Sequence, residues 1–337
     1  MSEHRTRPLR QDLQSKIQKA HDEGRCFTTL DKNEARRLRR ATRSGKLISP
    51  APRVYALSSC WEGLKAGDRH LYVVRALAKL HPDWTFCSVS AALVHGLSVS
   101  NKLLGSVHVA TTRHAHSPSS EGITRHVIGH DDFVEVNGVR VTSLSQTTFD
   151  VLRIASFRSG LALADSALRV AGISREQLLS TFEQIDPHTR GRQRALEIVA
   201  LADPRAESGG ESIARAVMLE LGAMPPMLQV LVGDRVDHSA DYRADFGWHL
   251  ADDTWVLGEL DGREKYENQA MTNGRDAVQV LADERLRESR VSASGAKIMR
   301  FSFAEAVKPA RMEHLLKAFG VPLGYPIPEV ALAGQAC

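Results

Sequence analysis

The sequence predicts a multi-domain α/β protein, and three observations support this fold class. The chain has 337 residues, whereas single hydrophobic cores usually stop growing at roughly 250–300 residues. Apolar residues make up 42% of the chain and charged residues 25%, as in ordinary globular proteins. Helix-like and strand-like patterns occur in both the middle and the C-terminal parts. We therefore expect several segments with separate cores.

Changes in composition divide the chain into five segments. The clearest boundary is the stretch PHTRGRQRALEIVALADPRAESGG, in which a short helix is followed by a loop containing Pro, Ser and Gly. We expect a basic N-terminal region at 1–62, a mixed α/β domain at 63–185, a linker helix at 186–206, a C-terminal domain at 207–323 and a tail at 324–337.

Composition also bears on location. No run approaches the roughly 18 consecutive apolar residues of a membrane-spanning helix, and the N-terminus MSEHRTRPLRQDLQSK has no apolar region of the signal-peptide type. The four cysteines are scattered without CxxC spacing, so reduced thiols are expected. We expect a cytoplasmic protein without a membrane partner. The net charge of +4 is only mildly basic and does not by itself indicate nucleic-acid binding.

Basic charge is concentrated in KNEARRLRRATRSGKLISPAPR, residues 32–53. Ala35, Leu38 and Thr42 recur at helical spacing, so one face of a helix is expected to point inward, and Gly45 is expected to end it. A strand-like run follows at 54–57. A basic helix, a turn and a β-wing are the elements of a winged helix-turn-helix, which places one helix in the major groove. The expected DNA contacts are Arg36, Arg37, Arg39, Arg40, Arg43 and Lys46. A solvated basic helix remains the alternative, because charge runs alone are usually solvated.

The middle region reads as mixed α/β. Helical SVSAALVHGL is followed by strand-like SVHVATT, ITRHVIGH and VRVTSL, and then by helical FDVLRIA and GLALADSALRVAG. Its histidines show no HExxH or other tight ligand spacing, so we assign no metal to them.

The C-terminal domain reads as an αβββαβ unit. The helix ESIARAVMLELG precedes three strand-like runs, MLQVLVGD, DYRADFGWHL and TWVLGELDGR. A helix, RDAVQVLADERLRES, and a strand, AKIMRF, complete the order.

Three acidic residues of this unit lie at the start of its first helix and in two of its strands. Glu211 lies in the first turn of its helix, Asp245 in the strand ADFGW, and Glu259 at the end of an apolar strand. Carboxylates in core strands are costly unless they are paired, hydrogen-bonded or bound to a cation. Strand alternation places Glu259 and Asp261 on one face. The alternatives are that Glu211 caps its helix and that Asp245 pairs with a nearby arginine, Arg243 or Arg275.

Oxygen ligands of this kind suit Mg²⁺ or Mn²⁺ rather than zinc. We expect Asp245, Glu259 and Glu211 to hold the metal. Metal-assisted attack on a phosphodiester also needs positive charge at the phosphate, which Lys265 would supply. Arg275 and Arg300 are further candidate phosphate contacts. The hypothesis is a set of catalytic residues formed by Glu211, Asp245, Glu259, Asp261 and Lys265.

The series ESxxR, ADFGW, ELDGREKY, RD and KIMRF resembles the domain family related to very-short-patch-repair endonucleases, within the PD-(D/E)XK superfamily. The resemblance covers about the last 130 residues of the sequence. It implies a restriction-endonuclease-like core in which Glu211, Asp245 and Glu259 match the family's acids. Many members of the superfamily carry Lys two residues after the second acid, where this sequence has Asp261, so the lysine role falls to Lys265.

The upstream region resembles another family. The basic helix and wing ending in RVYALS, followed by SAALVHGL and VRVTSLSQTTFDVLR, resemble AbiEi-type antitoxins of bacterial type IV toxin-antitoxin systems. The resemblance implies a winged-helix DNA reader, a mixed α/β domain and a cognate nucleotidyltransferase-type toxin as partner.

Two functional hypotheses follow. The first is a metal-dependent DNA endonuclease directed to DNA by its N-terminal region, in a setting such as defence or a toxin-antitoxin system. The second is a DNA-binding regulator or antitoxin whose nuclease-like domain is not catalytic, which the absence of the family's lysine favours.

Overall fold

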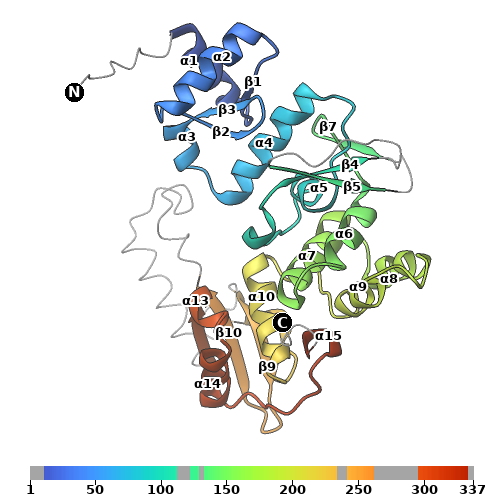
Figure 1. Ribbon diagram of the computed structural model, residues 1–337. Coiled ribbons are helices and arrows are strands. Elements are labelled where there is room, and N and C mark those ends of the chain that lie inside the picture. The colour runs from blue at the N-terminus through green and yellow to red at the C-terminus, as the bar shows by residue number, and fades with distance from the viewer. Residues whose placement is uncertain (1–10, 112–121, 129–132, 234–240, 262–294, 333–337) are drawn as a thin grey trace. The chain divides into compact units, whose positions relative to one another are not determined.

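The structure is a computed structural model that describes residues 11–111, 122–128, 133–233, 241–261 and 295–332 (Figure 1). It is a mixed α/β protein with more than one domain, as the sequence predicts. Within the described residues, no helix is both long and apolar enough to cross a membrane.

The chain divides into two compact units, Met1–Val151 and Leu152–Cys337, here called unit 1 and unit 2. The division falls inside the middle region that we expected at 63–185. The helices that follow residue 152 therefore belong to the same unit as the C-terminal sheet. Each unit is described by itself below.

The first part of unit 1 contains two helices, a three-stranded sheet and a short helix. Their bounds are α1 Gln11–Asp22, β1 Phe27–Thr28, α2 Lys32–Arg43, β2 Leu47–Ala51, β3 Val54–Leu57 and α3 Ser58–Glu62. The sheet has the order β1-β3-β2 with antiparallel pairing throughout. The expected strand at 54–57 is confirmed, whereas α1, β1 and β2 carried no signal that we used.

Helix α2 forms where the basic pattern predicted it. Asp31 caps the helix, and its carboxylate accepts hydrogen bonds from the backbone N–H groups of Asn33 and Glu34, both at 2.7 Å. At the other end Gly45 has a φ of 74°, the left-handed conformation common just past a helix C-terminus. Leu38 is fully buried. It packs with residues of α1 and of all three strands in a small core.

The second part of unit 1 is mixed α/β. Its elements are α4 Ala66–Leu80, α5 Ser88–Val94, the 3₁₀ helix η1 Asn101–Leu103, β4 Val107–Thr111, β5 Ile123–Val127, β6 Val134–Val136, β7 Val139–Val141 and α6 Leu144–Leu152. Strands β4 and β5 are parallel, and β6 and β7 form an antiparallel hairpin. Phe86 is fully buried between these strands and α4, and it bridges β4 and β7 through backbone pairing with Val109 and Val141.

Unit 2 begins with four helices and continues into a four-stranded sheet. Its elements are α7 Phe157–Ala171, α8 Arg175–Glu183, α9 Arg192–Ala200, α10 Gly209–Glu220, β8 Met227–Gly233, β9 Asp241–His249, β10 Trp255–Asp261, β11 Lys297–Ser302, α13 Phe303–Ala306, α14 Pro309–Phe319 and α15 Glu329–Leu332. The helix expected at 275–289 lies outside the described residues.

Two ion pairs join α7 to α10. Asp165 is fully buried, and its two carboxylate oxygens accept hydrogen bonds from Arg215 at 2.7 and 2.8 Å. About two turns of α7 closer to its N-terminus, Arg158 pairs with Glu220 at 2.6 Å. These contacts explain why the helices after residue 152 fold with the C-terminal sheet.

The sheet of unit 2 has the order β11-β10-β9-β8. Strands β8, β9 and β10 pair antiparallel, and β11 pairs parallel to β10. Helices α10 and α14 lie against one face of this sheet (Figure 1). There Phe246 and Trp248 of β9 are fully buried in the main core of the unit. The predicted order of a helix, three strands and a last strand is confirmed within the described residues.

Candidate functional site

Side chains stop alternating regularly between the two faces of the sheet at Gln229 of β8 and at Asp245 of β9. On β9, Phe246 belongs to the core under α10, but Ala244 belongs to a small cluster on the other face. On β8, Leu228 and Val230 are divided between the same two clusters. In a regular strand, residues two apart point to one face. Gln229 has a φ of 53°, and such irregularities are common beside active sites.

The Asp245 side chain accepts a hydrogen bond that a backbone carbonyl would accept in a regular sheet. Its Oδ2 accepts a hydrogen bond from the backbone N–H of Leu260 at 2.9 Å. The regular pairing of β9 with β10 ends at Phe246 and Gly258. A carboxylate therefore satisfies an amide of β10 just beyond the last paired residues, and this hydrogen bond holds Asp245 beside the end of β10 that carries Glu259.

Glu259 is a largely buried carboxylate with close charged neighbours. Its Oε2 lies 3.0 Å from a guanidinium nitrogen of Arg300, its register partner on β11. The pKa of Glu259 is raised, chiefly by burial, and repulsion from Asp245 and Asp261 acts in the same direction, while Tyr242 and Arg300 oppose it. Asp245 and Asp261 are therefore close enough to Glu259 to affect its charge.

Tyr242 lies on the same side of the sheet as Glu259. Its side chain is buried with Ala244 and Leu257, and no hydrogen bond of good geometry meets its hydroxyl within the described residues. The pKa of Tyr242 is strongly raised, first by burial and then by the neighbouring Glu259. This phenol is therefore a neutral donor beside the acidic cluster at all ordinary pH values.

Glu211 is held in a different environment. Ser208 caps α10, and its hydroxyl donates to the Glu211 carboxylate at 2.7 Å while accepting from the Glu211 N–H at 3.1 Å. The carboxylate also accepts from the backbone N–H of Glu207 at 2.8 Å and from the Gln229 amide at 3.1 Å. The alternative in which Glu211 stabilises its own helix start thus describes its contacts well.

Glu211 and Glu259 lie on opposite faces of the sheet. A Cβ on Gly210 would stand 3.0 Å from the Leu260 side chain, so Leu260 points toward α10. Because alternate strand residues point to opposite faces, Glu259 points away from α10.

The structure therefore places Asp245, Glu259 and Asp261 near one another at the end of β9 and β10, and the Glu211 carboxylate at the start of α10, where Gln229 of β8 donates to it. Among the described residues, no three His, Cys, Asp or Glu side chains are grouped closely enough to hold one metal ion. Lys265 and Arg275 lie outside the described residues. Arg243, considered as a partner of Asp245, pairs instead with Glu207 at 2.8 Å.

The expected DNA contacts in unit 1 lie on the exposed side of α2 and just after it. All six residues are exposed: Arg36, Arg37, Arg39, Arg40, Arg43 and Lys46. Ala35 and Leu38 are buried and Thr42 is half-buried, so the predicted inward face is confirmed.

Two contributors to the acidic site, Tyr242 and Gln229, were not expected from the sequence. Alternation along DYRADFGW would have placed Tyr242 with Ala244 on an inward face. No local pattern signals Gln229, because its role depends on a left-handed backbone within a strand.

No family model matches the chain, and no solved structure matches it significantly. Similar curated proteins are two uncharacterized proteins of Mycobacterium tuberculosis, MT2308 of strain CDC 1551 / Oshkosh and Rv2248 of strain H37Rv. Each is 30% identical to this chain over 163 residues, which are 48% of the chain and 58% of the relative. The match thus spans little more than half the length of each relative.

Proposed function

We propose that the protein is a metal-dependent DNA endonuclease whose reaction takes place at Asp245 and Glu259. The observation that carries the proposal is the half-buried Glu259 carboxylate near the end of β10, with Asp245 held beside it by the hydrogen bond to the Leu260 N–H. Burial and the nearby Asp245 and Asp261 raise the pKa of Glu259. Gathering like charges in a half-buried place costs stability. A site that binds a cation compensates for that cost.

The order of α10, β8, β9 and β10, with β11 parallel to β10, supports an αβββαβ core of the PD-(D/E)XK type for unit 2. The two acids stand on the second and third strands of this order. These are the strands on which the resemblance to very-short-patch-repair endonucleases places them.

The residues fit a hard divalent cation by their chemistry. Carboxylate oxygens are the ligands that Mg²⁺ and Mn²⁺ prefer, and Asp245 and Glu259 would hold the ion. When bound, such an ion supplies Lewis-acid activation of a water molecule and of the phosphodiester. Glu211, with its carboxylate engaged at the start of α10, acts as a positioning residue for that helix and, through Gln229, for the neighbouring strand.

Arg300 has a role in this proposal because it is the cation that now balances Glu259. A metal ion on Glu259 would compete with the guanidinium. Arg300 would then be available to the DNA phosphate, for which the fork of a guanidinium is well suited.

Unit 1 would bring the nuclease to DNA. An antiparallel sheet of order β1-β3-β2 beside α1 and α2 supports a winged helix-turn-helix. Helix α2 would be the reading helix, and the hairpin β2–β3 the wing. The exposed arginines of α2 would contact DNA phosphates and bases.

The test is cleavage of supercoiled and linear DNA by the purified protein in Mg²⁺ or Mn²⁺. The variants Asp245→Asn and Glu259→Gln keep the side-chain shape and remove the charge. Each should lower the cleavage rate by about 100-fold or more, the loss expected when a group that stabilises charge in the reaction is removed. The matched control is Asp253→Asn in the β9–β10 turn, where the carboxylate is 92% exposed. Equal rates in the control and the two variants would contradict the proposal.

A second function is favoured by different contacts. The Glu259 carboxylate is paired with Arg300, Glu211 is satisfied by its own helix start, and Asp261 stands where many superfamily members have lysine. These contacts suit a DNA-binding regulator or antitoxin with a noncatalytic nuclease-like domain and a nucleotidyltransferase-type toxin as partner. Specific DNA binding without cleavage in any divalent cation would support this function over the nuclease.

A further inference from the structure

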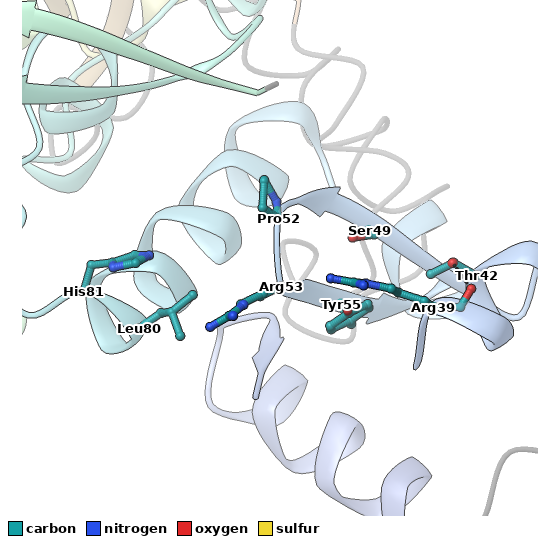
Figure 2. Close-up of a pocket in the computed structure, with 8 residues that line it drawn as sticks. All are labelled: Arg39, Thr42, Ser49, Pro52, Arg53, Tyr55, Leu80 and His81. Atoms are coloured by element: carbon teal, nitrogen blue, oxygen red, sulfur yellow. Dashed lines mark hydrogen bonds between the residues drawn. The ribbon is translucent and has the colours of Figure 1, made fainter. Parts of the chain in front are cut away.

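A pocket of about 360 Å³ lies beside α2 in unit 1 (Figure 2). It is formed by the end of α2, the hairpin β2–β3 and the residues that end α4. Its lining consists of Arg39, Thr42, Ser49, Pro52, Arg53, Tyr55, Leu80 and His81. The lining therefore contains two arginines, a histidine and three hydroxyl groups, but no carboxylate.

The two guanidinium groups reach this pocket from different elements. Arg39 projects from α2 and runs past Tyr55, while Arg53 stands on the hairpin and extends toward the end of α4 (Figure 2). Neither side chain forms an ion pair with an acidic residue in the part of the chain that the structure describes. Their charges are thus not neutralised within this part of the protein.

His81 forms the third polar wall. Its ring stacks on Trp84 with 3.9 Å between the ring centroids, and Arg125 lies 4.8 Å above the same indole. Burial, then Arg125 and Arg53, lowers the pKa of His81. Arg53 lines the same pocket as His81, and the lowered pKa favours a neutral ring that can donate one hydrogen bond.

The remaining walls lower the local dielectric constant and limit the size of the ligand. Tyr55 is 1% exposed, and Pro52 and Leu80 add apolar surface. The carbonyl end of α4 contributes a partial negative charge of about half a unit. The two full charges of Arg39 and Arg53 outweigh it, so the pocket attracts anions.

We propose that this pocket binds a phosphate group between Arg39, Arg53 and His81. Guanidinium forks match phosphate oxygens in geometry and charge. The hydroxyls of Thr42 and Ser49 already donate to the backbone carbonyls of Arg39 and Ala51, so the donors for the phosphate are the two guanidinium groups and the His81 imidazole. The phosphate comes either from the DNA backbone beside the wing or from a free nucleotide. The first source rests on the DNA binding proposed above, and the second does not.

The first arm of the test measures binding of a labelled DNA duplex of about two helical turns by fluorescence anisotropy, in EDTA and over a range of salt concentrations. Without divalent ions the nuclease reaction plays no part, so failure of cleavage and failure of this inference remain distinguishable. Arg53→Gln should weaken binding by about three- to tenfold and reduce the slope of log K against log salt by roughly one. Arg175→Gln, which removes an exposed arginine from unit 2, should change neither value.

The second arm titrates inorganic phosphate and a deoxynucleoside 5′-monophosphate against the wild type, and follows the His81 imidazole by NMR. Saturable shifts that Arg53→Gln abolishes identify a free phosphate compound as the source. His81→Gln, which leaves the hairpin untouched, should weaken whichever interaction is found, and circular dichroism checks that each variant is folded.

The two arms give separable results. Selective loss of DNA affinity in Arg53→Gln without saturable phosphate binding assigns the pocket to the DNA backbone. Saturable phosphate binding in a protein that does not bind DNA supports the inference and contradicts the DNA-binding role of unit 1. If Arg53→Gln behaves like Arg175→Gln toward DNA and no probe saturates, the pocket does not bind phosphate.

Discussion

The acidic end of the unit 2 sheet and the basic surface of unit 1 arrange charge in opposite ways. In unit 2, Glu259 and Asp165 are largely or fully buried, and each faces an arginine of the same unit. In unit 1, Arg36, Arg39 and Arg53 are exposed. Buried charges need internal partners because desolvation is costly. Exposed charges need none and remain available to an external anion.

This difference determines where a charged ligand can bind without first breaking an ion pair of the protein. A phosphate reaching Arg53 displaces only water, whereas a cation reaching Glu259 has to compete with Arg300. Unit 1 is therefore suited to binding an anion, and unit 2 to a step in which a cation replaces Arg300 beside Glu259. Four variants test this difference between the two units.

The largest effect is expected from Asp165→Asn. The substitution leaves the guanidinium of Arg215, 7% exposed, without its charged partner between α7 and α10. Breaking a buried pair by removing one partner costs about 3–5 kcal/mol, and urea unfolding followed by circular dichroism would measure that loss. The control is Glu313→Gln, which removes an exposed pair with Lys317 and should cost about 0.5 kcal/mol or less. Similar losses of unfolding free energy in both variants would mean that burial does not determine how much these ion pairs contribute to stability.

A smaller effect is expected from Gly247→Ala, in the ADFGW strand. A Cβ at this position would lie 2.6 Å from a methyl carbon of Val230 and 3.2 Å from its Cβ. Overpacking of this kind costs about 1–3 kcal/mol and would also move β9 beside Asp245. Thermal unfolding should show the loss. Gly105→Ala, where the added Cβ has no neighbour within 4 Å, should leave the melting temperature unchanged.

In unit 1, Asp31→Ala should destabilise the start of α2 and weaken by a small factor the DNA binding proposed for this unit. Backbone N–H groups of Glu34 and Asn33 lower the pKa of Asp31. A lowered folded-state pKa stabilises the protein above the ordinary Asp pKa of about 3.9, and this contribution is lost as the pH falls through the folded value. The difference in unfolding free energy between wild type and Asp31→Ala should therefore be constant from about pH 5 to 8 and shrink in acid. Asp31→Asn, which keeps the cap, should bind DNA as the wild type does.

The smallest effect is expected from Glu259→Gln, which should slightly stabilise the protein, whereas the other three variants should destabilise it. The pKa of Glu259 is raised, first by burial and also by repulsion from Asp245 and Asp261. Tyr242 and Arg300 act to lower this pKa but do not cancel the rise. A raised folded-state pKa stabilises the protein below the ordinary Glu pKa of about 4.3, and this contribution is lost as the pH rises through the folded value. At pH 7 the neutral variant should be slightly more stable than the wild type, and the gain should disappear in acid. A loss of stability at pH 7 would show that the pair with Arg300 outweighs desolvation.

Local patterns sufficed for much of the fold. The strand at 54–57, the basic helix ending before Gly45 and the order of elements from α10 to β10 were all expected, because each depends on neighbours within one turn or one strand. Helix α14 and strand β2 were not expected. Met312 and Leu316 of α14 are fully buried against the sheet. The segment does carry helix signals, with Pro309 in its first turn and Gly320 just past its end, and we did not use them.

Composition and periodicity indicated a globular balance of residues, a basic segment, and three acids on a helix and two strands. Which of these residues meet depends on how the elements pack. Asp245 and Glu259 come together because β9 and β10 are paired, while Glu211 faces the other side of the sheet. Arg39, Arg53 and His81 share one pocket because a hairpin packs beside the ends of two helices. Such contacts join residues distant in the chain, and the periodicity of a single segment carries no information about them.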